Sequence, residues 1–297
     1  MSDVTTPLLL TGHHKDLGGG FMVRRLLPSA KKQSVGPFIF FDHFGPVTVT
    51  PDSNYDVRPH PHIGLSTVTY LFEGAIMHRD KLGSVQQVEP GAINWMTAGS
   101  GIVHSERRPD ALKQRDYVNH GLQLWAALPA SHEEVDAEFV HTPAADIPEL
   151  RVNDADVRVL IGEAFGHTSP VKTYSPTLYL DVKLPAGGEL VLPPLADELA
   201  VYAVDADFTL DGVAVPAFTM VVLPAGVDVR LAAQAGARLM ILGGEPLGHR
   251  FMWWNFVSSR KDRIVQASED WLAMRMGTVP NDDAEFIPLP ERRFTAE

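Results

Sequence analysis

The stretch RPHPHIGLSTVTYL, residues 58–71, decides the fold of this 297-residue chain more than any other. It opens with a His-x-His pair, His60 and His62, and continues into Ser66–Phe72, a run rich in β-branched and aromatic residues. Such runs are typical of strands, in which residues i and i+2 point to the same face of the sheet. On a strand, the two imidazoles can therefore converge on one point inside a barrel.

The rest of the chain repeats this β pattern. Its 24 Gly and 23 Pro separate short apolar or alternating runs at intervals of about ten residues, the spacing expected of a sandwich or barrel. Asp211-Gly212, between two such runs, is a two-residue hairpin signal. Because the length favours two domains, we predict an all-β protein with domains at residues 1–140 and 141–297, joined through a polar stretch at 129–156.

One helix is predicted near the C-terminal end, followed by a Pro-rich tail on the surface. Ser259 is the expected N-cap, and the apolar residues that follow it recur at helical spacing. These residues are Ile264, Ala267, Trp271 and Met274, before Gly277. We expect an amphipathic helix that packs on the sheet, near the end of the second domain.

Composition restricts the chemistry. The chain has no cysteine, which excludes disulfides, iron–sulfur clusters and Cys nucleophiles, so a metal must be held by His and carboxylate ligands. A net charge of −12 disfavours direct binding to nucleic acid. The sequence offers neither a signal peptide nor a membrane span, and we expect a cytoplasmic protein.

A second pair with the same spacing, His104 and Glu106, follows His62 after 42 residues. If the two segments are neighbouring strands, three imidazoles and one carboxylate meet at a common centre. One His-x-His pair among 12 histidines carries little weight, but two spaced pairs predict a metal site. Nitrogen and oxygen donors suit Fe(II), Mn, Ni, Cu or Zn, and four protein ligands leave two positions open on a six-coordinate ion.

Residues 58–71 resemble the signature of the pirin family, a bicupin branch of the cupin superfamily. Residues 94–106, NWMTAGSGIVHSE, are similar to the second block of that family, and residues 36–45 and 243–247 also resemble it. The resemblance implies two stacked cupin (jelly-roll-like) β-barrels, with metal in the first only. The second half of the chain is consistent with a domain without metal, because its two histidines, His167 and His249, belong to neither a His-x-His nor a His-x-Glu pair.

The resemblance also implies a ligand set and an activity. The iron ligands of pirins fall on His60, His62, His104 and Glu106; Thr67 stands where the general cupin pattern has its Glu. The implied activity is that of a quercetin 2,3-dioxygenase, in which Fe(II) and O2 open a flavonol ring to carbon monoxide and a depside. Glu106 is the residue expected to act as both metal ligand and general base.

Two other functions stay open from the sequence. One is a non-enzymatic redox or regulatory protein that binds a protein partner through the state of its iron. The other is a zinc-dependent sugar isomerase of the cupin superfamily, which the position of Glu106 and the lack of a Lys/Arg cluster near the site disfavour.

The remaining candidates near the site receive weaker expectations. Asp42 and His43 either hydrogen-bond a ligand imidazole or bond to backbone, and His78 is expected in a hairpin turn. The large apolar residues of the β runs are expected in the core rather than in contact with a cofactor. They are Phe40, Trp95, Met96 and Trp125.

Overall fold

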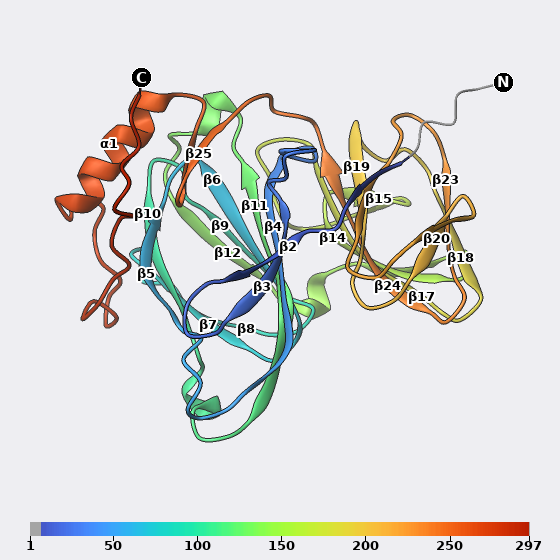
Figure 1. Ribbon diagram of the computed structural model, residues 1–297, viewed down its shortest axis with the longest axis horizontal. Coiled ribbons are helices and arrows are strands. Elements are labelled where there is room, and N and C mark those ends of the chain that lie inside the picture. The colour runs from blue at the N-terminus through green and yellow to red at the C-terminus, as the bar shows by residue number, and fades with distance from the viewer. Residues whose placement is uncertain (1–6, 297) are drawn as a thin grey trace. The chain divides into compact units, whose positions relative to one another are not determined.

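The structure is a computed structural model that describes residues 7–296, and its regular structure is almost entirely antiparallel β (Figure 1). The all-β prediction with one C-terminal helix is confirmed. The chain divides into two compact units. The first, here called the histidine unit, comprises residues 14–24, 41–144 and 247 onward; the apolar unit comprises residues up to 13, 25–40 and 145–246. No helix within residues 7–296 has the length and apolar character needed to cross a membrane.

Two sheets make up most of the histidine unit. The seven-stranded sheet has the order β12-β9-β6-β11-β4-β3-β2, and the four-stranded sheet has the order β5-β10-β7-β8. Val88 of the smaller sheet packs with Phe44 and Leu71 of the larger one, so the sheets face each other across an apolar core. The strands are β2 (His13–Asp16), β3 (Met22–Leu27), β4 (Phe38–Val49), β5 (Val57–His62), β6 (Leu65–Glu73), β7 (Ile76–Asp80), β8 (Val85–Val88), β9 (Ile93–Thr97), β10 (Ile102–Arg107), β11 (Tyr117–Ala127) and β12 (Glu138–Thr142).

The apolar unit repeats this pattern of one seven-stranded and one four-stranded sheet. Their orders are β1-β22-β19-β24-β17-β14-β13 and β18-β23-β20-β21, with a separate β15-β16 hairpin. As predicted, Asp211 and Gly212 form the two-residue turn between β20 and β21, with φ of 49° and 82°. The strands are β1 (Leu8–Leu10), β13 (Glu149–Val152), β14 (Ala155–Ile161), β15 (Glu163–Ala164), β16 (His167–Thr168), β17 (Thr177–Leu184), β18 (Gly188–Leu192), β19 (Glu198–Ala203), β20 (Phe208–Leu210), β21 (Val213–Val215), β22 (Met220–Val222), β23 (Val229–Ala233) and β24 (Ala237–Gly244).

The stretch at 129–156 is structured rather than a simple linker. It contains the short 3-10 helices η2 (Ala130–His132) and η3 (Ala144–Asp146), together with β12 and β13. The expected boundary at residue 140 falls inside β12, which pairs with β9 at the edge of the larger sheet. An edge strand needs few apolar side chains, and for this reason its polar composition resembled a loop. A further 3-10 helix, η1 (Asp110–Leu112), lies between β10 and β11.

The C-terminal helix differs from the prediction in its ends and in the unit it joins. Helix α1 spans Lys261–Leu272, and its N-cap position is Arg260, without a side-chain cap; Ser259 bonds to Glu133 instead. Met274 lies beyond the helix with a φ of 54°. The helix packs on the histidine unit, to which residues 247 onward belong. Its buried residues Ile264, Ala267 and Trp271 contact Ile63 and Val103.

A last hairpin precedes the helix. It consists of β25 (Phe251–Trp253) and β26 (Phe256–Ser258), which pair through Trp253 and Phe256. Phe256 forms a parallel bridge with Ile63, the residue directly after His62. The C-terminal segment therefore contributes to the wall of the unit that carries the spaced histidine pairs.

Candidate metal centre

Three histidines from two neighbouring strands meet inside the histidine unit. His60 and His62 lie on β5, and His104 lies on β10, which is antiparallel to β5 with His104 opposite His60. Each residue offers a ring nitrogen, and these nitrogens all lie within 4.8 Å of one another. The ring centroids are 4.3 Å to 5.1 Å apart. Because β5 and β10 are neighbours, the three histidines of the two spaced pairs form one cluster of nitrogen donors.

Hydrogen bonds determine which nitrogens are available. Nδ1 of His60 lies 2.8 Å from the Arg58 carbonyl oxygen, and Nδ1 of His62 lies 3.1 Å from that of Asn255. Because a carbonyl oxygen can only accept, both Nδ1 atoms carry the proton, and both Nε2 atoms have a free lone pair. The ring nitrogens of His104 are buried and have no hydrogen-bond partner within residues 7–296. Orphaned buried nitrogens beside two free Nε2 atoms fit a bound cation.

The electrostatics keep the three rings neutral. The pKa of His60 is lowered to about 4, mainly by burial and also by the nearby His78, although the hydrogen bond to the Arg58 carbonyl raises it. Burial also holds the pKa values of His62 and His104 well below the usual range, and the neighbouring histidines lower them further. A neutral imidazole is the form that binds a metal, so no proton must be removed at neutral pH.

Glu106 lies near the cluster but outside it. The four-residue set was expected from the sequence, whereas among the described residues the close donor group consists of the three histidines. The pairing of β10 with β5 shifts between His104 and Glu106, so that Glu106 lies opposite Val57. Burial raises the pKa of Glu106 to about 7. A cation at the cluster would favour the ionised carboxylate and lower this pKa.

A polar pair that the sequence did not single out as part of the site borders His104. His78 was expected in a turn, but it lies in β7, opposite Glu106, with its ring centroid 5.3 Å from that of His104. Asp80 accepts a hydrogen bond from Nε2 of His78 (3.1 Å) and two more from the backbone N–H groups of Leu82 and Ser84. Burial raises the pKa of Asp80, but these hydrogen bonds outweigh it and lower the pKa overall. The spacing His78-x-Asp80 was the signal that could have placed this pair on the site face.

The other expected neighbours lie elsewhere. His43 pairs with His120 at 2.8 Å between their Nε2 atoms, rather than with a histidine of the cluster. Trp125 is buried as expected, and its ring also meets His62 edge-on with centroids 5.2 Å apart. The remaining residues expected in the core, Phe40, Trp95 and Met96, are buried, and Asp42 is buried as well.

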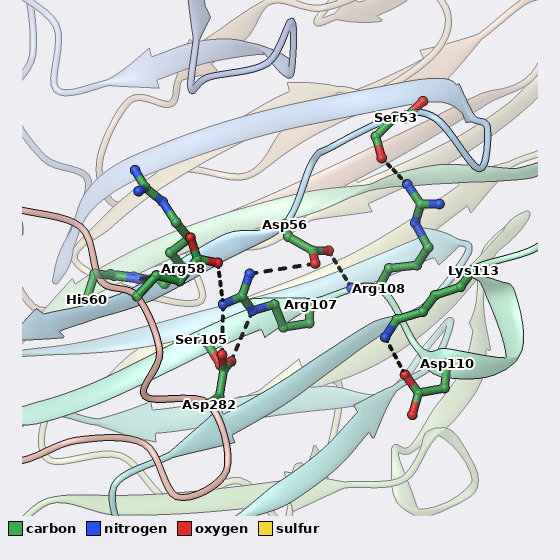
Figure 2. Close-up of polar contacts among 11 residues, drawn as sticks. Ser53, Asp56, Arg58, His60, Ser105, Arg107, Arg108, Asp110, Lys113 and Asp282 are labelled. Atoms are coloured by element: carbon green, nitrogen blue, oxygen red, sulfur yellow. Dashed lines mark hydrogen bonds and ion pairs between the residues drawn. The ribbon is translucent and has the colours of Figure 1, made fainter.

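The C-terminal tail holds the outward face of β10. Asp282 accepts hydrogen bonds from Ser105 Oγ (2.6 Å) and from Nε (3.0 Å) and Nη2 (2.8 Å) of Arg107. Figure 2 shows Arg107 between Asp282 and Asp56, whose carboxylate lies 3.7 Å from Nη1. Ser105 and Arg107 alternate with His104 and Glu106, so the tail fixes the strand that carries the candidate ligands.

Comparison with known proteins gives consistent matches over both units. Sequence profiles match at residues 20–126 for Pirin and at residues 179–277 for the Pirin C-terminal cupin domain. A pirin-like protein of Caulobacter vibrioides is 46% identical over 287 residues, which cover 96% of this chain and 99% of that protein. A pirin-like protein of Solanum lycopersicum is 32% identical over 261 residues, 86% of each chain. The crystal structure of quercetin 2,3-dioxygenase from Acinetobacter baumannii has a TM-score of 0.89 and 34% identity, covering 98% of this chain and 97% of that one.

Proposed function

Because the chain belongs to the pirin family, we propose that it is an iron-dependent dioxygenase of the quercetin 2,3-dioxygenase type. The observation that carries the proposal is the group of three buried, neutral imidazoles with free nitrogens in one 4.8 Å cluster. The reaction class is supported by the structural similarity of this chain, over 98% of its length, to a quercetin 2,3-dioxygenase. The proposed substrates are a flavonol and O2.

The proposed ligands are His60, His62, His104 and Glu106. The Glu106 carboxylate makes no hydrogen bond to the described part of the chain, so turning it toward the cluster would break no hydrogen bond. When bound, the ion supplies Lewis acidity and a fixed template for an oxygen of the substrate. The nitrogen and oxygen donors suit Fe(II), and they also accept Mn, Ni, Cu or Zn.

Glu106 is proposed to move the proton as well. Its carboxylate would accept the proton of the flavonol 3-hydroxyl, and the residue's partial exposure gives a substrate hydroxyl access to it. One side of the cluster is apolar, because the buried Trp125 ring lies against His62 there. Glu106 would thus accept the substrate proton beside an apolar wall.

Metal analysis and oxygen uptake test the proposal together. The purified chain loaded anaerobically with Fe(II) is expected to consume O2 in a quercetin-dependent manner and to release carbon monoxide. Iron at one equivalent without uptake over a panel of flavonols would reject the dioxygenase and favour a regulatory protein that uses the state of its iron. Stoichiometric zinc with sugar isomerisation would favour the isomerase.

A further inference from the structure

The turn of the β25–β26 hairpin supports His62 from behind. Its two turn residues are Trp254 and Asn255, and the Asn255 carbonyl oxygen accepts the Nδ1 proton of His62 at 3.1 Å. Trp254 has a φ of 53°, a left-handed conformation that is uncommon for a large residue. The direction of this carbonyl, and with it the orientation of the His62 ring, therefore depends on a specific backbone conformation of the turn.

The hairpin also lies directly against the chain that follows His62. The Val257 N–H donates to the Ile63 carbonyl at 3.2 Å. Gly64 has a φ of 68°, and a Cβ there would overlap the Val257 carbonyl oxygen. Only glycine permits this approach without a shift of one backbone, so the end of β5 and the hairpin are fitted to each other.

Glu133 fixes the chain at the end of the hairpin. Its carboxylate accepts hydrogen bonds from Ser258 Oγ (3.0 Å), Ser259 Oγ (2.9 Å) and the Ser259 N–H (2.8 Å). It also forms an ion pair with Arg250, with 2.8 Å between Nε and Oε1, and the two side chains are only 5% and 7% exposed. A buried carboxylate with this many partners holds its neighbours in one arrangement.

Arg250 fixes the chain at the start of the hairpin. Its Nη1 donates to the carbonyls of Leu247 (2.8 Å) and His249 (3.1 Å), and its Nη2 donates to that of Leu128 (2.9 Å). Leu128 directly follows β11, the strand that carries Trp125 against His62. The Glu133–Arg250 pair thus joins both ends of the hairpin to the body of the histidine unit.

We propose that the buried Glu133–Arg250 pair positions the metal centre, by holding the turn whose Asn255 carbonyl orients His62. Glu133 and Arg250 are positioning residues, since neither touches the cluster. The inference rests on the metal site of the proposed function, but it is independent of the reaction catalysed there. A partner that orients a ligand imidazole typically changes metal affinity by about 10–100-fold when it is lost.

The first test compares Glu133→Gln with Glu134→Gln. Glu134 is the matched control, because it is the next residue and pairs with Arg263 on helix α1, but it is 51% exposed and makes no hydrogen bond to the hairpin within residues 7–296. Both variants are titrated with Co²⁺ against a competing chelator, and the absorption spectrum of bound Co²⁺ is recorded. Glu133→Gln is expected to bind about 10-fold more weakly or worse, with an altered spectrum, and Glu134→Gln to match the unaltered chain.

The second test changes the turn itself and does not depend on the buried pair. Trp254→Asn and Trp254→Val both remove the indole, but Asn tolerates the left-handed conformation and a β-branched Val does not. Trp254→Val is therefore expected to weaken Co²⁺ binding and alter the spectrum more than Trp254→Asn does. If Glu133→Gln does not fold, the two Trp254 variants still test whether the turn conformation orients His62, the step through which the buried pair is proposed to act.

The outcomes distinguish a positioning role of Glu133 from a purely structural one, and they distinguish failure of this inference from failure of the proposed function. If Glu133→Gln lowers the melting temperature of the metal-free chain but leaves affinity and spectrum unchanged, Glu133 is merely structural and the inference is wrong. Equal effects of the two Trp254 variants would also overturn it. If the unaltered chain binds Co²⁺ and Fe²⁺ stoichiometrically but shows no flavonol-dependent oxygen uptake, the proposed function fails while the positioning result stands. Failure of the unaltered chain to bind metal would overturn both.

Discussion

At the scale of single residues, the direction of a hydrogen bond decides what the cluster can bind. The carbonyls of Arg58 and Asn255 accept the protons of His60 and His62 and so turn the Nε2 lone pairs inward. His104 has no such partner, and both of its buried ring nitrogens remain unsatisfied within residues 7–296. An unsatisfied buried nitrogen costs about 1–3 kcal/mol. A bound cation would remove this cost, so metal binding should stabilise the fold.

Removal of one histidine should abolish metal binding without unfolding the chain. His60→Ala and His104→Ala are expected to lose stoichiometric Fe²⁺ or Co²⁺ binding and all flavonol-dependent oxygen uptake. The surrounding core is apolar and does not need the ion, so circular dichroism should stay close to that of the unaltered chain. The exposed His167, in the apolar unit, gives the control His167→Ala. Full metal occupancy in both cluster variants would show that the ligands are misassigned.

The two proposed roles of Glu106 can be separated by substitution. Glu106→Gln retains an oxygen donor of the same length but cannot accept a proton at neutral pH. We expect metal affinity to fall by about 10-fold or more, and oxygen uptake at saturating metal to fall by about 100-fold or more, the typical contribution of a general base. Uptake that recovers fully once the variant is saturated with metal would leave Glu106 a ligand only.

At the scale of elements, sequence spacing predicted the two strands that carry the cluster, because a period of two residues is a property of every strand. For the histidines of the two pairs to meet, the strands that carry them had only to be neighbours, and β5 and β10 are paired directly. The shift in pairing that separates Glu106 from the cluster could not be predicted, since it depends on how β5 is fitted against β10. The position of His78 in β7 was missed because short polar strands resemble turns.

The C-terminal tail holds strand β10 through Asp282, although its polar, Pro-rich sequence predicted only a surface segment. Asp282→Asn removes the charge that Ser105 and Arg107 bind in Figure 2. Hydrogen bonds to charged groups contribute about 1.5–3 kcal/mol each, less where they are partly exposed. We expect a loss of about 2 kcal/mol in the free energy of unfolding, measured with urea. Asp283→Asn, at an exposed neighbouring residue, is the control, and equal stability of the two variants would mean that the tail does not hold β10.

At the scale of the whole molecule, the two units have the same sheet architecture but differ in their potential metal ligands. Each has a seven-stranded and a four-stranded sheet, whereas the close histidine group lies in one of them. The resemblance to a bicupin predicted this duplication. It did not predict that residues 25–40 join one unit and residues 247 onward the other. Such exchanges depend on contacts between segments far apart in the chain, such as Trp271 with Val103, and no local pattern encodes them.

Buried neutral histidines should also make the stability of the metal-free chain depend on pH. Burial, together with the positive charges that His120 and Arg24 can carry, lowers the pKa of His43 to about 3. The usual pKa of about 6.5 applies in the unfolded chain. Between these two values the unfolded chain binds a proton that the folded chain does not, so the free energy of unfolding falls as the pH is lowered from about 6.5 toward 3.

This histidine should contribute a slope of about 1.4 kcal/mol per pH unit in that window. His43→Gln keeps a hydrogen-bonding side chain next to His120 but cannot be protonated, and it is expected to reduce the slope by about that amount. Urea unfolding at several pH values between 6.5 and 4, in the presence of a chelator, measures it. The buried histidines of the metal cluster titrate in both proteins, so the difference between the two slopes isolates His43. An unchanged slope would mean that His43 is protonated in the folded chain and that its pairing with His120 does not require a neutral ring.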